Sequence, residues 1–108
     1  MSSKQSQYKI LKSLEKDPNY TQRQLSSDLD ISLGGVNYCL KGLVEKGFVK
    51  IDNFRKSENK AQYSYLLTPK GVEEKVKLTI EFIKIKTQEY ERLKNEIKNL
   101  KTEAREYK

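Results

Sequence analysis

S-L-G-G-V-N-Y-C-L-K-G-L-V-E-K-G, residues 32–47, is the stretch that decides the fold of this chain. It begins with a serine, a preferred helix N-cap, and ends with a glycine, which readily adopts the left-handed conformation found after helix C-termini. Apolar residues recur between these two ends at helical spacing and predict one buried stripe, formed by Val36, Leu40, Leu43 and Val44, with Cys39 at its margin. We therefore predict an amphipathic helix over residues 32–46.

The opposite face of this helix carries Gly34, Asn37, Tyr38 and Lys41. These residues offer hydrogen-bonding and cationic groups without a single acid, unlike the mixed charges of an ordinary solvated helix face. Base edges and phosphates in a DNA groove accept hydrogen bonds from groups of this kind. The face therefore predicts contact with DNA.

Two shorter helices are predicted before this stretch. An apolar stripe that includes Tyr8, Leu11 and Leu14 indicates a helix from Gln7 to about Lys16, after a polar and frayed segment over residues 1–6. It should end at Asp17-Pro18-Asn19, because a residue before proline is disfavoured in helical geometry.

The sequence Thr21-Gln22-Arg23-Gln24 matches a capping box and starts the second helix, which should end near residues 28–30. Two short helices joined by a tight turn, the second one capped by Ser32, form a helix-turn-helix. The turn lacks the glycine often found there.

The hydrophobic period changes from 3.6 to 2 after Gly47, which predicts strands over residues 48–52 and 62–67. Between them, residues 53–60 form a polar and basic tip. A hairpin with a charged tip directly after a helix-turn-helix is a wing. Tyr63 and Tyr65 fit packing in the sheet better than stacking on DNA bases.

A long helix is predicted from Thr68, an N-cap followed by Pro69 at the first helical position. It should extend for roughly 35–40 residues. Apolar residues at the a and d positions of a heptad repeat, with Glu at g and Lys at e, predict a parallel two-stranded coiled coil, although Lys86 interrupts a d position. The predicted dimer interface consists of Val76, Ile83, Tyr90, Leu93, Ile97 and Leu100.

The composition favours a polyanionic partner. The net charge is +7, and residues 1–70 contain 12 Lys and Arg against 7 Asp and Glu. One cysteine and no histidine argue against a disulfide framework, a metal site or a cofactor. No apolar run approaches the ~18 residues of a membrane span, and no signal peptide is evident, so we expect a cytoplasmic, nucleoid-associated protein and no membrane partner.

The chain resembles the MarR-type winged-helix transcriptional regulators, above all their short members associated with exopolysaccharide (EPS) gene clusters. The resemblance rests on residues 32–50, on the basic hairpin, and on L-L-T-P-K-G at residues 66–71. It implies a bacterial homodimer bound to double-stranded DNA, with one helix in the major groove and the wing near the minor groove. Typical members are longer, and the single terminal helix of this chain argues against the small-molecule effector pocket that many of them have.

Site residues follow from the geometry of a helix-turn-helix, in which the second helix presents its N-terminal residues to base edges. Base contacts are predicted for Gly34, Asn37, Tyr38 and Lys41. Backbone contacts are predicted for Thr21, Gln22, Arg23, Ser32 and Gly35. Wing contacts with phosphate or the minor groove are predicted for Arg55, Lys56 and Lys60.

The predicted fold is mainly α with a small β-hairpin: a winged helix-turn-helix domain over residues 1–68 and a long C-terminal dimerisation helix over residues 69–108. The predicted function is sequence-specific DNA binding by a homodimeric transcriptional regulator, a repressor. The alternative is a winged-helix adaptor for protein assembly, with the coiled coil as its docking helix. An enzyme is not expected, because the sequence has no histidine, no glycine-rich phosphate loop and no paired carboxylates on one face.

Overall fold

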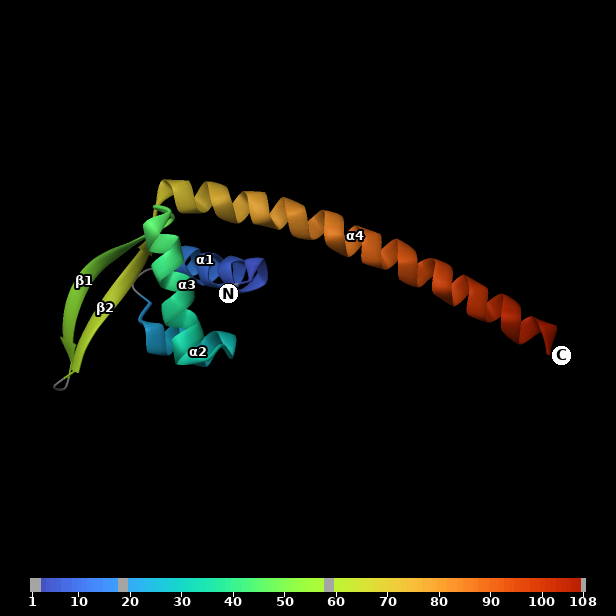
Figure 1. Ribbon diagram of the computed structural model, residues 1–108, viewed down its shortest axis with the longest axis horizontal. Coiled ribbons are helices and arrows are strands. Elements are labelled where there is room, and N and C mark those ends of the chain that lie inside the picture. The colour runs from blue at the N-terminus through green and yellow to red at the C-terminus, as the bar shows by residue number, and fades with distance from the viewer. Residues whose placement is uncertain (1–2, 18–19, 58–59, 108) are drawn as a thin grey trace. The chain divides into compact units, whose positions relative to one another are not determined.

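The computed structural model describes residues 3–17, 20–57 and 60–107, and only the backbone of residues 53–57 and 60–62. Its elements are α1 (Lys4–Lys16), α2 (Gln22–Leu29), α3 (Leu33–Glu45), β1 (Val49–Ser57), β2 (Lys60–Leu67) and α4 (Pro69–Glu106) (Figure 1). The chain divides into two units, Met1–Leu78 and Thr79–Lys108, so α4 begins in the first and continues in the second. The predicted fold class is confirmed: a mainly helical winged helix-turn-helix with a long C-terminal helix.

The residues that cap the two ends of α3 are as predicted. The Ser32 hydroxyl accepts a hydrogen bond from the Gly35 amide at 3.0 Å, and Gly47 adopts a φ of 78° after the last turn. A side chain is strained in this conformation, whereas glycine is not. The two residues therefore fix where the helix begins and ends.

The turn before α3 works without glycine. The predicted capping box of α2 is present, with the Thr21 hydroxyl accepting from the Gln24 amide and the Gln24 side chain accepting from the Thr21 amide. After α2, Asp30 takes the left-handed position with a φ of 54°. Aspartate tolerates this region better than most residues, so it supplies the turn that glycine would otherwise make.

Helix α1 begins earlier than predicted. Residues 4–6 are helical rather than frayed, because the Ser3 hydroxyl accepts a hydrogen bond from the Ser6 amide at 3.0 Å and caps the first turn. The helix ends at Lys16, as predicted. Pro18 and Asn19, which were expected to end it, lie outside the described residues.

The hairpin strands are longer than predicted. Residues 53–57 were expected in a loop but continue β1, and the antiparallel pairing runs out to Ser57 opposite Lys60. A register shift between Ile51 and Phe54 lets two residues of β1 face one of β2, which is a β-bulge. Cross-strand pairing therefore overrides the low strand propensity of this polar segment.

The core of the first unit draws side chains from every element. Its buried apolar residues are Ile10, Leu11, Leu14, Leu25, Val36, Cys39, Leu40, Leu43, Val49, Tyr65 and Leu78. The stripe of α3 is turned slightly from the predicted one: Cys39 is 1% exposed and lies in the core, whereas Val44 is only half-buried. Helices α1, α2 and α3 thus share one small core with the base of the hairpin (Figure 1).

Hydrogen bonds join the first turn of α4 to the turn between α3 and β1. The Thr68 hydroxyl donates to the Gly47 carbonyl oxygen at 2.6 Å and accepts from the Gly71 amide at 3.0 Å. The Thr68 amide donates to the Phe48 carbonyl oxygen at 3.1 Å. An ion pair between Lys75 and Glu15 links the same part of α4 to α1.

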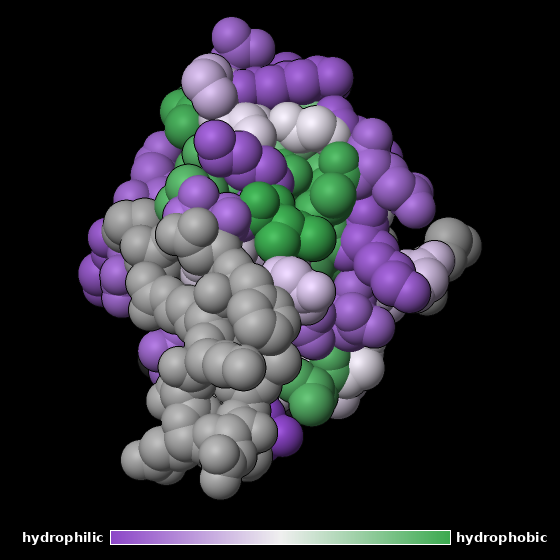
Figure 2. Space-filling model, turned by 90° about the vertical axis from the view of Figure 1, so that its left-hand side faces the viewer, coloured by the Kyte–Doolittle hydropathy of each residue, from purple (hydrophilic) through white to green (hydrophobic). Residues whose placement is uncertain are grey.

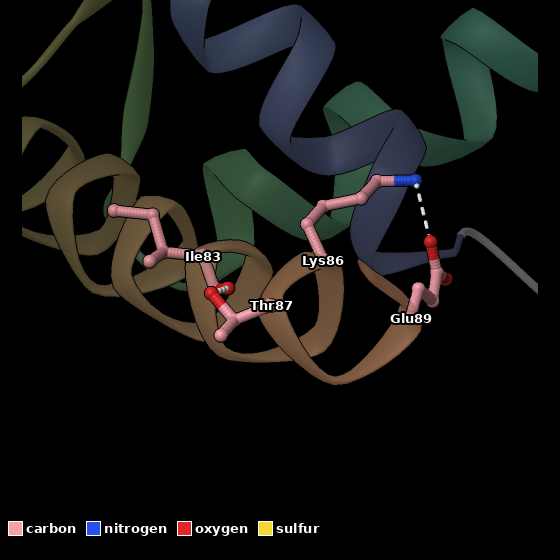
Figure 3. A network of polar contacts seen from close by, with 4 residues as sticks. All are labelled: Ile83, Lys86, Thr87 and Glu89. Atoms are coloured by element: carbon pink, nitrogen blue, oxygen red, sulfur yellow. Dashed lines mark hydrogen bonds and ion pairs between the residues drawn. The ribbon is translucent and has the colours of Figure 1, made fainter. Parts of the chain in front are cut away.

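The second unit is a single helical segment. The Thr87 hydroxyl donates to the Ile83 carbonyl oxygen at 2.7 Å, and Lys86 pairs with Glu89 at 3.3 Å (Figure 3). Both contacts stay within the helix. No helix in the described part of the chain is long and apolar enough to cross a membrane.

Candidate nucleic-acid interface

The outer face of α3 is open along its first half. Gly34, Asn37, Tyr38 and Lys41 are all exposed, Tyr38 by 57%. They come within the first nine residues of α3, and the N-terminal part of a recognition helix reads base edges. The structure thus brings the four predicted base-contact residues together on one accessible surface.

The two glycines of the first turn have different surroundings. A Cβ added to Gly34 would meet no atom within 4 Å, so packing within the described residues does not require a glycine there. A Cβ on Gly35 would lie 3.0 Å from the Ser32 hydroxyl oxygen and 3.1 Å from Ile31 Cγ2. The helix cap therefore explains Gly35, whereas the fold leaves Gly34 unexplained.

The start of α2 presents one exposed side chain of the three predicted there. Thr21 is buried and its hydroxyl caps the helix, and Gln22 is half-buried. Arg23 is exposed. Arg23 is consequently the residue of this group whose side chain is available to a phosphate.

A hydrogen-bond network joins α2, α3 and β2. Gln22 Nε2 donates to Asn37 Oδ1 at 3.1 Å and to the Tyr65 hydroxyl at 2.9 Å. An amide nitrogen has two hydrogens, so these bonds use both donors of Gln22. Its side chain has then only an acceptor left, which phosphate does not bind. Both donors of the Gln22 amide are therefore used within the protein, and a contact of Gln22 with the DNA backbone stays a prediction.

Sequence reasoning did not find the role of Tyr65. This residue is 43 positions from Gln22, and its alternation within the strand indicates only that its ring faces the sheet core. No local pattern could have indicated which group the Tyr65 hydroxyl binds. This contact forms only because β2 folds beside the start of α2.

The wing residues lie along the strands instead of in a loop. Arg55 and Lys56 belong to β1 and Lys60 to β2, with Arg55 opposite Gln62 and Lys56 opposite Ala61. Their side chains lie outside the described part of the structure. Figure 2 shows a hydrophobic area on this side of the molecule with hydrophilic residues around it.

The arrangement offers groups that can form hydrogen bonds and ion pairs. Asn37 presents amide donors, Tyr38 a hydroxyl and Lys41 an ammonium group on one face. Across residues 3–17, 20–57 and 60–107, no three His, Cys, Asp or Glu side chains gather where they could hold a metal ion.

Residues 4–50 match the family model described as winged helix-turn-helix DNA-binding. The match covers α1, α2 and α3 and ends in β1, so it includes the outer face described above. A comparison with curated protein sequences found no significant match.

Solved structures with the same fold are transcriptional regulators. The PcaV regulator of Streptomyces coelicolor, in complex with its natural ligand, has a TM-score of 0.68 at 16% identity and covers 79% of this chain and 59% of its own. A MarR regulator of Methanosarcina mazei Go1 has a TM-score of 0.60 at 26% identity, over 77% of this chain and 60% of its own.

The zinc-responsive regulator ZitR of Lactococcus lactis, in complex with DNA, has a TM-score of 0.57 at 25% identity, over 84% of this chain and 60% of its own. The present chain therefore spans about 60% of the length of the structures it matches. It carries a winged helix-turn-helix of the DNA-binding kind, and the regulators that it resembles in structure are members of the MarR family.

Proposed function

We propose that this protein is a sequence-specific DNA-binding transcriptional regulator that acts as a homodimer. The observation that carries the proposal is the exposed face of α3, where Asn37, Tyr38 and Lys41 lie together without an acidic neighbour among them. A helix in this position of a winged helix-turn-helix enters the major groove. The net charge of +7 supplies attraction to the phosphates.

Each part of the face has its own role. Asn37 is suited to bidentate pairing with adenine N6 and N7, and Lys41 to a guanine edge or a phosphate. Tyr38 contacts a thymine methyl group or a phosphate. Arg23 binds phosphate from the start of α2, and Arg55, Lys56 and Lys60 bind the backbone or the minor groove from the hairpin. Ser32 and Gly35 place backbone amides of the first turn of α3 near a phosphate.

The homodimer is proposed from α4. Its a and d positions include large apolar side chains that are about half exposed or more: Val76 48%, Ile83 59%, Tyr90 61%, Leu93 56%, Ile97 52% and Leu100 62%. A stripe of this length is costly to leave in water, and a second copy of α4 in a parallel coiled coil would cover it. Two copies of α3 would then bind half-sites about one helical turn of DNA apart.

Repression is the proposed outcome of binding. A dimer that fills two successive major-groove sites excludes other proteins from that DNA by occupancy alone. The likeness of residues 32–50 to the short EPS-associated regulators supports a target in such a gene cluster.

Selection of binding sites from a random DNA pool tests the function directly. We expect a pseudo-palindromic site, bound at least about 10³-fold more tightly than random duplex at physiological salt. Equal binding of selected and random duplex would exclude sequence-specific regulation. No binding even at ~50 mM salt, where phosphate contacts are strongest, would instead favour a protein-assembly adaptor.

Asn37→Ala should relax the sequence preference. Loss of one bidentate base contact removes about 1–3 kcal/mol of discrimination at a single base pair, while binding to random duplex changes little. Arg23→Ala is the contrasting variant: it should weaken all duplexes similarly and lower the salt slope by about one. Titrations of selected and random duplexes at several salt concentrations measure both. A uniform loss with Asn37→Ala would remove Asn37 from base reading.

Gly34→Ala should stabilise the fold and weaken DNA binding. The added methyl group meets nothing within 4 Å in the free protein, so the helix gains up to about 1 kcal/mol in propensity. Close approach to DNA leaves no room for that methyl, and overpacking of this kind costs about 1–3 kcal/mol of binding.

Gly42→Ala is the matched control for this change. Gly42 also has open space around its Cα in α3, but it lies two turns further from the helix N-terminus. The Gly42→Ala variant should gain similar stability and keep the wild-type affinity for DNA. Thermal unfolding and duplex titration report the two quantities separately, and unchanged affinity with Gly34→Ala would show that the backbone at Gly34 does not approach DNA closely.

A further inference from the structure

Tyr65 joins β2 to the start of α2. Its ring is 6% exposed and packs in the core of the first unit, and its backbone amide donates to the Tyr20 carbonyl oxygen at 3.2 Å, directly before α2. Its hydroxyl accepts from Gln22 Nε2 at 2.9 Å. Backbone and side chain therefore tie the same residue of β2 to the start of α2.

This hydroxyl holds the Gln22 side chain in place. A buried tyrosine hydroxyl needs a hydrogen-bond partner, and Gln22 supplies it. With one hydrogen of Nε2 bound to Tyr65, the other is directed to Asn37 Oδ1 at 3.1 Å. If the Gln22 amide turned over, its oxygen could still accept from the Tyr65 hydroxyl, which also donates, but the bond to Asn37 Oδ1 would be lost.

Gln22 in turn restrains the side chain of Asn37. The Asn37 side chain is exposed on α3, where a free amide would rotate and present its oxygen and nitrogen interchangeably. The bond from Gln22 selects the arrangement in which Oδ1 faces α2. This oxygen keeps a second lone pair, and Nδ2 keeps two donors, so a bidentate contact with adenine is still available.

We propose that Tyr65 is a positioning residue for DNA recognition: through Gln22 it holds the Asn37 side chain in place before DNA binds. This inference rests on the proposed function of α3 and adds to it a specificity residue at the base of the hairpin. A side chain that is already held in place needs less ordering when it binds its base.

Tyr65→Phe tests the proposal, because it removes the hydroxyl and keeps the ring. The ratio of affinities for selected and random duplex should fall about two- to tenfold, the effect of one neutral hydrogen bond, while affinity for random duplex stays the same. Tyr20→Phe is the matched control: the Tyr20 hydroxyl donates to Asp28 at 3.0 Å, a bond that raises the pKa of Tyr20 and does not involve α3. This variant should keep the wild-type ratio.

A double-mutant cycle with Gln22→Met separates positioning from general stability. Gln22→Met keeps a side chain of similar length and removes the amide, so it should lower the ratio as Tyr65→Phe does, and the double variant should show no further fall. The NMR signals of the Asn37 side-chain amide in the free protein should shift in Tyr65→Phe and stay unchanged in Tyr20→Phe. This measurement needs no DNA.

Three results would overturn the proposal: an unchanged ratio in Tyr65→Phe, an equal fall in Tyr20→Phe, or additive effects of Gln22→Met and Tyr65→Phe. The failure of the proposed function looks different. In that case the wild-type protein itself shows no preference for any duplex, whatever the NMR signals of Asn37 report about its orientation.

Discussion

Gly71→Ala should destabilise the first unit by about 1–3 kcal/mol, although alanine normally favours a helix. Gly71 is buried in the first turn of α4, and a Cβ there would overlap the Phe48 carbonyl oxygen and the Leu67 side chain. That carbonyl oxygen belongs to the backbone and accepts the Thr68 amide at 3.1 Å, so it cannot move aside without breaking a second contact. Denaturant unfolding should show a lower midpoint with an unchanged slope.

Gly42→Ala is again the matched control, because no atom lies within 4 Å of its added methyl group. It should raise the free energy of unfolding, whereas Gly71→Ala lowers it, so the same substitution acts with opposite signs at two helical positions. A Gly71→Ala variant as stable as the wild type would mean that α4 does not lie against the turn between α3 and β1 as described.

Ile97→Lys should separate the proposed dimer and weaken binding to a two-half-site duplex by about 10²–10⁴-fold. Ile97 is an a position of the heptad repeat and is 52% exposed in the single chain. In a parallel coil two lysines would face each other across the seam, where like charges and lost apolar burial both oppose pairing. The second half-site then no longer gains from being tethered to the first, which accounts for the loss of affinity.

Asn95→Lys introduces the same charge at an f position, away from the seam, and should leave the mass in solution and the affinity unchanged. Sedimentation or light scattering of the three proteins, at concentrations that span the DNA titration, gives the oligomeric state. If the wild type is a monomer, the dimer proposal is wrong. If Ile97→Lys remains a dimer, the interface lies elsewhere than at the a and d positions.

Two contacts within α4 bear on the strength of this seam. Lys86 occupies a d position, and in the single chain it pairs with Glu89, which occupies a g position. Lys94 lies over the Tyr90 ring, 5.9 Å from its centroid. Both side chains must exchange these local contacts for contacts across the dimer, and each exchange is worth little at an exposed site. Apolar burial at the other positions therefore has to supply most of the stability of the coil.

Local signals in the sequence determined the elements and their order. Ser32, Thr21 and Thr68 cap their helices as predicted, and Gly47 takes the left-handed position after α3. These signals were readable because each one acts within three or four residues, the distance over which a cap or a helical turn closes its hydrogen bonds. The apolar periodicity of α3 likewise separated its buried stripe from the face that carries Asn37.

Contacts between distant residues were decided only by the tertiary structure. The hairpin extends to Ser57 and Lys60 because the two strands pair with each other. Neither segment alone has a pattern that predicts this pairing. Gly71 is required by the Phe48 carbonyl group, and Gln22 bonds to both Asn37 and the Tyr65 hydroxyl, which is 43 positions away. A sequence shows which groups can donate and accept hydrogen bonds. Which of these groups meet depends on how the elements pack. The proposed positioning residue Tyr65 could therefore be identified only from the fold.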